Sequence, residues 1–599
     1  MPANYHVPVI FYICMKIYKK SMKKVILSLF AVSLLISWSY AQHAGSSAPY
    51  EFQARYHMLD SSELYVPKIA GKAFTATAPP TGTVRAIAEW EPAQAVLVCA
   101  YSYGGQPTFG IPYSLIAEMS ETYKVITMVE SLAHQTTVTN NYTNNAVNLS
   151  NCSFIIAPLD SYWARDFSPW FIMTNNNTVA IIDFPYNRPS RPNDDNVPVV
   201  MSTYLTEPLY GMNVMHTGGN YMCDGMGVAV MTDLVLDENS LTHAQIDTAF
   251  KQYMGIVNNY ITTDPLNDYI KHVDCWGKFL DVDKILIASV PTNNAQYTEY
   301  EAMAAYWANE ISSYGNHYQV YRVYEPNGQP YTNSIILNNK VLVPVKGGTS
   351  ASYDNAALAV YQDAMPGYEI LGFTQLSSAP WQSTDALHCR AHEIADKGML
   401  YINHMPLLGE KTVQSQYPVT AGIYAVSGSS IIADSVYLKY KVYHGSWGAW
   451  TKINMTNTAG NIWTANIPQQ MAGDTILYYI HAADQSPRNV NHPLIGQPDP
   501  HRFYINGTAT TIENYDLTKA IVFPNPATDF LFVQMQNTGD AETTVLLTDL
   551  TGKQVKYISE KNLDTRMLRL DISSLPAGTY FLSIHSGDFL KNQKIMVIH

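Results

Sequence analysis

The amino-acid sequence predicts an α/β fold over roughly its first two thirds, followed by two small all-β domains. Between Val84 and about His404, stretches with helical periodicity are repeatedly followed by short β-rich runs. After His404 the helical pattern stops, and short alternating segments are separated by Gly, Pro, Asn and Asp turns. At 599 residues the chain is also too long for one hydrophobic core. Several domains are therefore expected.

The N-terminus has the pattern of a secretory signal peptide. Residues 1–41 contain five lysines and no acidic residue, and they include the apolar run Val25 to Ile36 and the small-residue site Ser39-Tyr40-Ala41. A signal of normal length would begin at Met22. The alternative, a membrane anchor, is weaker because the apolar run is shorter than the roughly 20 residues that a spanning helix needs. No transmembrane span is expected once the signal is removed.

The chain that follows the signal is acidic. Residues 42–82, rich in Ala, Ser, Thr and Pro, show no periodic pattern and are interpreted as a pro-segment and linker. The net charge of −13 becomes −18 when the five lysines of residues 1–41 are removed. Such a charge argues against a nucleic-acid partner and mildly favours a cationic substrate.

Five cysteines remain after residue 41. An odd number in an oxidising compartment leaves at least one thiol unpaired, or paired between chains. We expect Cys389 to be the free thiol. The other four are Cys99, Cys152, Cys223 and Cys275.

Residues 83–408 are expected to form the α/β domain from a recurring helix-then-strand unit. The predicted helices carry apolar residues near three- and four-residue spacing. This recurrence favours a repeated α/β unit over a doubly wound sheet. A hairpin is predicted from Ser334 to Val345, with its turn at Asn338-Asn339. The clearest units are Ile111 to Tyr123 then Val125 to Val129, Tyr300 to Ser313 then Tyr318 to Tyr321, and Asn355 to Ala364 then Glu369 to Gly372.

The two C-terminal domains are expected at residues 409–508 and 509–599, and both are predicted to be β-sandwiches. In the first, the alternating segments Val436 to Val442 and Ile476 to Ile480 predict strands. In the second, the segment Val545 to Leu550 is followed by the turn Thr551-Gly552, and a further strand ends near Leu582.

One cysteine lies among polar and ionisable neighbours. Cys389 is flanked by His388, Arg390 and His392. A thiolate is the nucleophilic form of cysteine, and cationic or hydrogen-bond-donating neighbours lower its pKa from about 8.5. The sequence therefore predicts a reactive thiol, although a buried and inert cysteine is the commoner outcome.

Other segments supply the remaining groups for covalent attack on a planar cation. A guanidinium stays protonated because its pKa exceeds about 12, so an enzyme must hold the cation and orient its plane. Two carboxylates can do this through paired N–H bonds, and Asp166 and Asp274 are the candidates. Cys389 would attack the central carbon, while His272 would protonate the departing ammonia and then take a proton from water.

Long, ordered segments of the α/β region also carry a resemblance to a known family. They are Ala86 to Glu91, Asp160 to Asp166, Thr217 to Met222, Tyr269 to Lys278, Tyr331 to Ser334 and Thr384 to Arg390. In these segments the chain resembles the guanidine-modifying (pentein) superfamily, and specifically the secreted bacterial peptidylarginine deiminases of the Porphyromonas type. The resemblance implies a five-bladed, pseudo-symmetric α/β propeller.

The resemblance also implies roles for single residues. Cys389 corresponds to the nucleophile, His272 to the acid/base, Asp166 and Asp274 to the guanidinium clamps, and Asn333 to a polar helper. The substrate slot would be lined by Trp163, Tyr269 and Thr384. Core packing is an equal alternative for Trp163, and Asn333 has the alternative of capping a turn. No metal or cofactor is expected, because no Cys/His cluster has zinc spacing and no twelve-residue calcium loop is present.

A proline-rich loop brings two arginines together in this acidic protein. In the family, two arginines of this loop hold the C-terminal carboxylate of the substrate, which implies that role for Arg188 and Arg191. The family has one residue between the arginines, whereas Pro189 and Ser190 separate them here. The alternative is that both pair with Asp194 and Asp195 on a solvated loop.

The two C-terminal domains carry resemblances of their own. Residues 409–508 resemble the immunoglobulin-like domain that follows the propeller in this family, through Tyr478 to Asp484 and Pro493 to Pro500. Residues 509–599 resemble the C-terminal sorting domain of type IX secretion substrates, through Val522 to Ala527 and Gln593 to Ile598. The second resemblance implies type IX machinery as a partner and a secreted or surface-attached protein, whereas an ordinary adhesion module is its alternative.

The expected function is hydrolysis of arginine residues in peptides or proteins to citrulline and ammonia, with C-terminal arginines favoured. A first alternative is an agmatine deiminase, which shares Glu89-Trp90-Glu91-Pro92 and the motifs around His272 and Cys389. Those enzymes are typically cytosolic single domains, so the signal peptide and the added β domains argue against this alternative. A second alternative is a catalytically silent surface adhesin, which predicts a damaged catalytic set, and the sequence shows none.

Overall fold

The computed structural model describes residues 74–506, 520–523, 525, 527–535, 542–549, 553–560, 567–586 and 589–598. The expected signal peptide and the part of the expected pro-segment before residue 74 lie outside the described residues. Among the helices that are described, none is long and apolar enough to cross a membrane.

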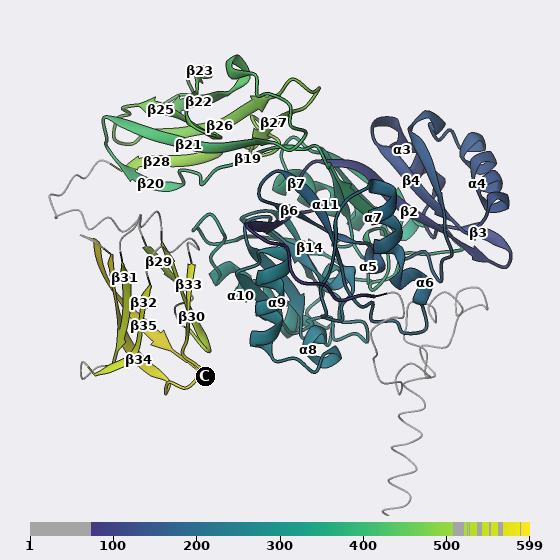
Figure 1. Cartoon of the computed structure of the whole chain (residues 1–599), viewed down its shortest axis with the longest axis horizontal. Coiled ribbons are helices and arrows are strands. Elements are labelled where there is room, and N and C mark those ends of the chain that lie inside the picture. Colours follow the sequence, from purple (N-terminus) through teal and green to yellow (C-terminus); the bar gives the residue numbers. More distant parts are fainter. Residues whose placement is uncertain are drawn as a thin grey trace, which may run out of the picture. The chain divides into compact units, whose positions relative to one another are not determined.

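Residues 84–395 form five separate sheets, and each sheet contains the same unit (Figure 1). Two antiparallel strands are followed by a helical crossover to a third strand, which pairs in parallel with the second. Because a parallel pair needs a long crossover connection, the helix that follows each pair is part of the unit. The predicted recurrence of helix and strand therefore corresponds to a mixed α/β region of many small sheets.

Four of the sheets follow one another along the chain. The first contains β6 (Trp170–Thr174), β7 (Thr178–Asp183), α6 (Pro192–Asp195), α7 (Val197–Leu205) and β8 (Leu209–Gly211), with β1 (Val84–Ala86) added beside β6. The second contains β9 (Met222–Cys223), β10 (Val228–Thr232), α8 (Leu234–Glu238), α9 (His243–Met254) and β11 (Asn258–Thr262). The third contains β12 (Gly277–Asp281), β13 (Lys284–Ser289), α10 (Tyr297–Asn309) and β14 (Gln319–Tyr324). The fourth contains β15 (Ile335–Leu337), β16 (Lys340–Val345), α11 (Ala351–Ala364) and β17 (Glu369–Thr374).

The fifth sheet joins the two ends of the α/β region. Its first strand, β18 (His392–Ala395), pairs antiparallel with β2 (Ala93–Tyr103), so the last strand of the region lies beside one of its first strands. The sheet continues through parallel pairs of β2 with β4 and of β4 with β5. Its remaining elements are β3 (Gln106–Thr108), α3 (Tyr113–Thr122), β4 (Lys124–Val129), α4 (Leu132–Asn144) and β5 (Cys152–Ile156).

The predicted hairpin at Asn338-Asn339 is confirmed. β15 and β16 pair antiparallel with Leu337 opposite Lys340, and Asn338 has a φ of 52°. Asparagine tolerates this left-handed conformation better than most residues. The side-chain amide of Asn338 also accepts from Ala93 N–H and donates to Ala93 C=O, both at 2.9 Å. The turn of one sheet is thereby fixed to the start of β2.

The next part of the chain is a β-sandwich of two sheets that share one buried core. β19 pairs with β21, so the sandwich begins before the boundary expected between residues 408 and 409. One sheet contains β19 (Leu400–Asn403), β21 (Gln416–Ala425), β25 (Ile462–Pro468) and β24 (Thr456–Ala459). The other contains β20 (Gly409–Thr412), β28 (His501–Asn506), β26 (Thr475–Ala483), β22 (Tyr437–Tyr443) and β23 (Thr451–Asn454), with β27 (Asn489–His492) beside β26.

The described residues after 519 also form two sheets with a common core. Their inward side chains alternate along each strand, as Val545 and Leu547 do in β31. One sheet contains β29 (Ala520–Phe523), β30 (Phe530–Met535) and β33 (Met567–Asp571). The other contains β32 (Gln554–Glu560), β31 (Thr543–Thr548), β34 (Gly578–Ser586) and β35 (Phe589–Val597).

Candidate active site

Five short segments, one before the first strand of each sheet, bring the candidate catalytic residues into one place. Asp166 lies in α5 (Ala164–Phe167) before β6, and Gly219 lies in a 3₁₀ helix before β9. Asp274 and Cys389 lie in 3₁₀ helices before β12 and β18, and Asn333 lies just before β15. The helical segments contact one another directly. The repeated unit thus places one group per sheet at a common centre.

Cys389 is fully buried at this centre. Its Sγ lies 3.3 Å from Asn333 Nδ2, 3.6 Å from Asp274 Oδ2 and 4.0 Å from the carbonyl oxygen of Thr384. The amide of Asn333 also accepts from the backbone N–H of Cys389, at 3.3 Å through Oδ1. The side chain of Asn333 therefore contacts both the thiol and the backbone of Cys389 and orients the thiol. The turn-capping alternative does not account for these two contacts.

His272 and the two carboxylates surround Gly219. His272 Nδ1 lies 3.8 Å from Asp166 Oδ1, and all three side chains are buried. A Cβ added at Gly219 would stand 2.6 Å from His272 Nδ1, 2.9 Å from Asp166 Oδ1 and 3.2 Å from Asp274 Oδ2. Real Cβ atoms do not approach that closely, so the three groups converge only because residue 219 has no side chain.

The prediction that neighbouring cations lower the pKa of Cys389 is wrong. Burial, and then the charges of Asp274, Asp385 and Asp166, raise the pKa of the Cys389 thiol well above its usual value. The neighbouring side chains of Arg390 and His392 form their contacts with groups other than the Cys389 thiol. Arg390 donates to Asp385 at 2.9 and 2.6 Å, and the ring of His392 contacts the carbonyl of Glu393.

His388 instead connects Asp274 to a second buried pair. Its Nδ1 lies 2.7 Å from Asp274 Oδ2, and its Nε2 lies 3.1 Å from Glu89 Oε2. Glu89 in turn accepts from Lys278 Nζ at 2.8 and 2.7 Å. Burial favours the neutral form of Asp274, but the hydrogen bond and charge of His388 and the charge of His272 hold its pKa below the usual value. The pKa of Glu89 is likewise lowered against burial by Lys278 and His388.

Each ring nitrogen of His388 therefore lies within hydrogen-bond distance of a carboxylate, one from Asp274 and the other from Glu89. Glu89 and Lys278 lie within the sequence motifs, but the motifs predicted no role at the site for either residue. The available signal was local, because Glu89 stands between Ala88 and Trp90 and Lys278 stands between Gly277 and Phe279.

The predicted substrate-slot residues lie at different depths. Trp163 is buried, as its core-packing alternative predicts, and its ring lies 4.8 Å from that of Tyr162. Thr384 is also buried and reaches Cys389 through its carbonyl. Tyr269 is 42% exposed.

Arg188 and Arg191 are both buried, although Ser190 and Pro192 of the same loop are exposed, so the solvated-loop alternative does not describe the two arginines. The guanidinium carbon of Arg191 lies 5.2 Å from the centre of the Trp163 ring. Asp194 accepts from the backbone N–H of Asp160 at 2.8 Å and from the hydroxyl of Ser161 at 2.7 Å. The arginine loop is thereby tied to the segment that ends in Asp166.

Burial also acts on the thiols of the other cysteines. Cys99, Cys152, Cys223, Cys275 and Cys389 all carry free thiols in the part of the chain that the structure describes. Burial raises the pKa of Cys152 to about 11 and of Cys223 to about 12.

Within the same described ranges, no group of three or more His, Cys, Asp and Glu is arranged to hold a metal ion.

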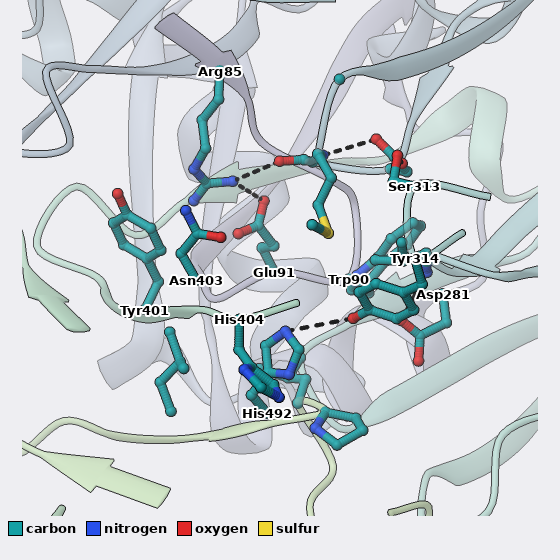
Figure 2. A pocket seen from close by; sticks show the side chains of 18 of the residues that line it. Arg85, Trp90, Glu91, Asp281, Ser313, Tyr314, Tyr401, Asn403, His404 and His492 are labelled. Carbon is teal, nitrogen blue, oxygen red and sulfur yellow. Dashed lines mark hydrogen bonds and ion pairs between the residues drawn. The ribbon is translucent and has the colours of Figure 1, made fainter. Parts of the chain in front are cut away.

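A cavity of about 410 Å³ lies away from Cys389, between the α/β region and the sandwich (Figure 2). At one end Arg85 forms an ion pair with Glu91 at 2.7 Å and stacks over Tyr401 at 4.4 Å. At the other end lie His404 and His492. Burial lowers the pKa of His404 to about 4, so this end is uncharged near neutral pH. None of the proposed catalytic groups lines this cavity.

Comparison with protein families gives two matches. Residues 85–394 match the family described as Porphyromonas-type peptidyl-arginine deiminase. Residues 521–598 match a secretion system C-terminal sorting domain. This domain identifies a type IX secretion substrate, which is secreted or attached to the cell surface.

Curated relatives are more distant. Two proteins of Legionella pneumophila, both named as candidate agmatine deiminases, are 21% identical to this chain. The match with the protein of strain Paris extends over 302 residues, which is 46% of this chain and 84% of the relative. The match with the Philadelphia 1 protein covers 40% of this chain and 74% of the relative.

The solved structures that match this chain include agmatine deiminases and a candidate arginine deiminase. An agmatine deiminase of Enterococcus faecalis is 16% identical, with a TM-score of 0.47, and is covered over its full length by 54% of this chain. A candidate arginine deiminase of Porphyromonas gingivalis is 17% identical, with a TM-score of 0.46, and its match covers 53% of this chain and 99% of that chain. An agmatine deiminase of C. jejuni is 18% identical, with a TM-score of 0.44, and its match covers 52% of this chain and 96% of that chain.

Proposed function

Because the chain belongs to the Porphyromonas-type peptidyl-arginine deiminase family, whose members hydrolyse guanidino groups, we propose that it converts C-terminal arginine residues of peptides or proteins to citrulline and ammonia. The observation that carries this proposal is the convergence of Cys389, His272, Asp166, Asp274 and Asn333. The five sheets that deliver these groups are, in this proposal, the blades of a closed α/β propeller.

In the proposed mechanism, the substrate guanidinium lies between Asp166 and Asp274, which accept its N–H groups and keep it cationic. The Sγ of Cys389 attacks the central carbon and forms a C–S bond. One C–N bond then breaks, and His272 donates the proton with which ammonia leaves. Water next adds to the same carbon while His272 accepts its proton. The C–S bond breaks, which releases the citrulline side chain and returns the cysteine.

His388 acts in this proposal as a positioning residue for Asp274. A carboxylate can clamp the substrate only while it is ionised and correctly oriented. The His388 ring between Asp274 and Glu89 orients Asp274 and helps to hold its pKa low, and Lys278 balances the charge of Glu89. The substrate cation in turn offsets the carboxylates that oppose ionisation of Cys389.

The effect of the carboxylates on Cys389 can be tested by pH. Replacing Asp274 with Asn removes a negative charge 3.6 Å from Sγ, so the thiol pKa should fall by about one unit or more. Alkylation of Cys389 by uncharged iodoacetamide, followed by mass spectrometry of its peptide, should then rise at lower pH than in the wild type. Asp281→Asn, at a half-buried carboxyl group at the end of β12, is the control and should leave the profile unchanged. An unshifted profile in Asp274→Asn would contradict this account of the thiol.

The preference for C-terminal arginine is supported by the arginine loop. Arg188 and Arg191 are both buried, and Asp194 connects their loop to the segment of Trp163 and Asp166. The charges of both arginines also oppose the burial that raises the pKa of the Tyr186 hydroxyl. Two guanidinium groups on one loop are suited to binding a carboxylate.

The substrate class is tested by assaying citrulline, or its decarboxylated analogue, from four compounds. These are a peptide ending in arginine, the same peptide amidated, free arginine and agmatine. Arg191→Ala is expected to lower kcat/KM for the free-carboxylate peptide by about 10-fold or more, the scale of a charge-assisted hydrogen bond. The amidated peptide should be affected much less, because it offers no carboxylate.

The names of the curated relatives favour agmatine as the second candidate substrate. Agmatine has no carboxylate, so its turnover would not depend on Arg188 or Arg191. Agmatine turnover that exceeds peptide turnover and survives Arg191→Ala would establish this alternative. No product from any of the four compounds would remove the deiminase proposal altogether.

A further inference from the structure

The sandwich of residues 400–506 exposes a sheet face that is both aromatic and cationic. On β22 the residues at odd positions point away from the core, because Leu438 is a core residue and Tyr440 and Val442 pack against that core. Pairing continues this outer face onto β23, β26 and β28 (Figure 1). We call it the aromatic-basic face, defined by Tyr437, Lys439, Lys441, Tyr443, Trp447, Trp450, Lys452, Tyr479, His481, Arg502 and Tyr504.

Lysines and rings of this face are held against each other. Lys441 Nζ lies 4.7 Å from the centre of the Trp447 ring and 5.0 Å from that of Trp450. Lys452 and Lys439 lie 4.3 and 5.8 Å from the centre of the Tyr437 ring. Cation–π contacts of this kind keep an ammonium in place without neutralising it. The cations are therefore positioned in advance of any ligand.

In the described part of the chain, no ion pair involves Lys439, Lys441, Lys452 or Arg502 of this face. Several lysines of the α/β region do have an acidic partner, such as Lys271, Lys278 and Lys340. One acidic residue, Glu410, lies at the edge of the face, opposite Tyr504 on β20. A net positive face is thus preserved on a chain whose total charge is −13.

Three rings of the face are also accessible. Trp447 is 45% exposed, Tyr504 43% and Tyr443 40%. Exposed aromatic groups gathered on one surface are typical of binding sites. The face follows an open sheet, and neither the cavity beside Tyr401 nor the smaller one beside Glu89 reaches it. Its form suits an extended ligand that lies across several strands.

We propose that the aromatic-basic face binds an anionic polysaccharide. The apolar faces of sugar rings would pack on the exposed aromatic groups, and the carboxylate or sulfate groups would meet the positioned lysines. A protein partner fits less well, because lysine is depleted in protein–protein interfaces. A nucleic acid also fits less well, because affinity for its backbone requires many cations and the face carries only the four cations Lys439, Lys441, Lys452 and Arg502. This binding site is separate from the proposed deiminase chemistry.

The test uses the whole exported protein and its retardation in native gels that contain a dissolved polymer. Polygalacturonate, which carries a carboxylate on each sugar, should retard the protein, and neutral dextran should not. The triple variant Lys439→Ala, Lys441→Ala, Lys452→Ala should lose at least about 10-fold in affinity, the combined scale of three exposed charge contacts. The double variant Trp447→Ala, Trp450→Ala should lose affinity even at high salt, where charge attraction is screened.

A charge-matched control separates this face from general electrostatics. Lys124, Lys251 and Lys397 are exposed and lie in the α/β region, and the triple alanine variant of these residues should bind polygalacturonate like the wild type. Equal losses in the two triple variants would overturn the proposal. Tighter binding of an oligothymidylate or a polyglutamate peptide than of polygalacturonate would also overturn it, in favour of a nucleic acid or an acidic protein. Unchanged deiminase activity in every variant would show that the fold is intact.

Discussion

Cys389→Ala is expected to abolish citrulline formation while leaving substrate binding in place. The proposed nucleophile is lost, but Asp166 and Asp274 still clamp the guanidinium. Removing a nucleophile that acts as part of a catalytic unit lowers kcat on the order of 10⁴-fold or more. The drop is measured from initial rates with a peptide ending in arginine, and binding is measured by calorimetry.

The matched control for this variant is Cys275→Ala. Cys275 is also a buried free thiol, and its Sγ lies 3.5 Å from Asp274 Oδ1, about as near as that of Cys389 lies to Oδ2. A haloacetamidine should label Cys389 and not Cys275, and Cys275→Ala should remain active. Turnover by Cys389→Ala near the wild-type rate would eliminate covalent catalysis by this residue.

Gly219→Ala is expected to inactivate the enzyme without unfolding it. The new methyl group would stand 2.6 Å from His272 Nδ1 and 2.9 Å from Asp166 Oδ1, so both side chains must move. A displacement of about 1 Å at a reacting group costs roughly 10²-fold in rate. We expect kcat/KM to fall by at least that factor, while the thermal unfolding midpoint changes little.

Gly277→Ala provides the comparison for this prediction. Gly277 begins β12, just after Asp274, and a Cβ there would meet only backbone oxygens at 3.7 Å, an ordinary van der Waals distance. This variant should therefore keep its activity. If the two alanine variants lost activity to the same extent, crowding of His272 and Asp166 would not be the cause.

Much of the local structure could be predicted from the sequence. The apolar spacing placed α11 at Asn355 to Ala364, and the helix extends over Ala351–Ala364. The Asn338-Asn339 pair predicted a hairpin because asparagine adopts left-handed turn conformations. The pairing of β18 with β2 could not be predicted in the same way, since nothing in either segment specifies a partner so far away along the chain.

The candidate site could likewise be predicted only in part from the sequence. Motifs identified Cys389, His272, Asp166, Asp274 and Asn333, and the structure brings them together. The polar neighbours of Cys389 were misinterpreted because adjacent residues of a 3₁₀ helix point in different directions. Arg390 turns to Asp385, and His388 turns to Glu89, which comes from the other end of the α/β region.

The pairing of β18 with β2 has a consequence for when the protein becomes active. The 3₁₀ helix of Cys389 ends directly before β18, so the strand that closes the α/β region also delivers the proposed nucleophile. The other proposed groups come from the segments before β6, β12 and β15. A chain in which β18 has not yet paired with β2 would therefore lack a positioned nucleophile, and the proposed reaction would begin only when this last strand is in place.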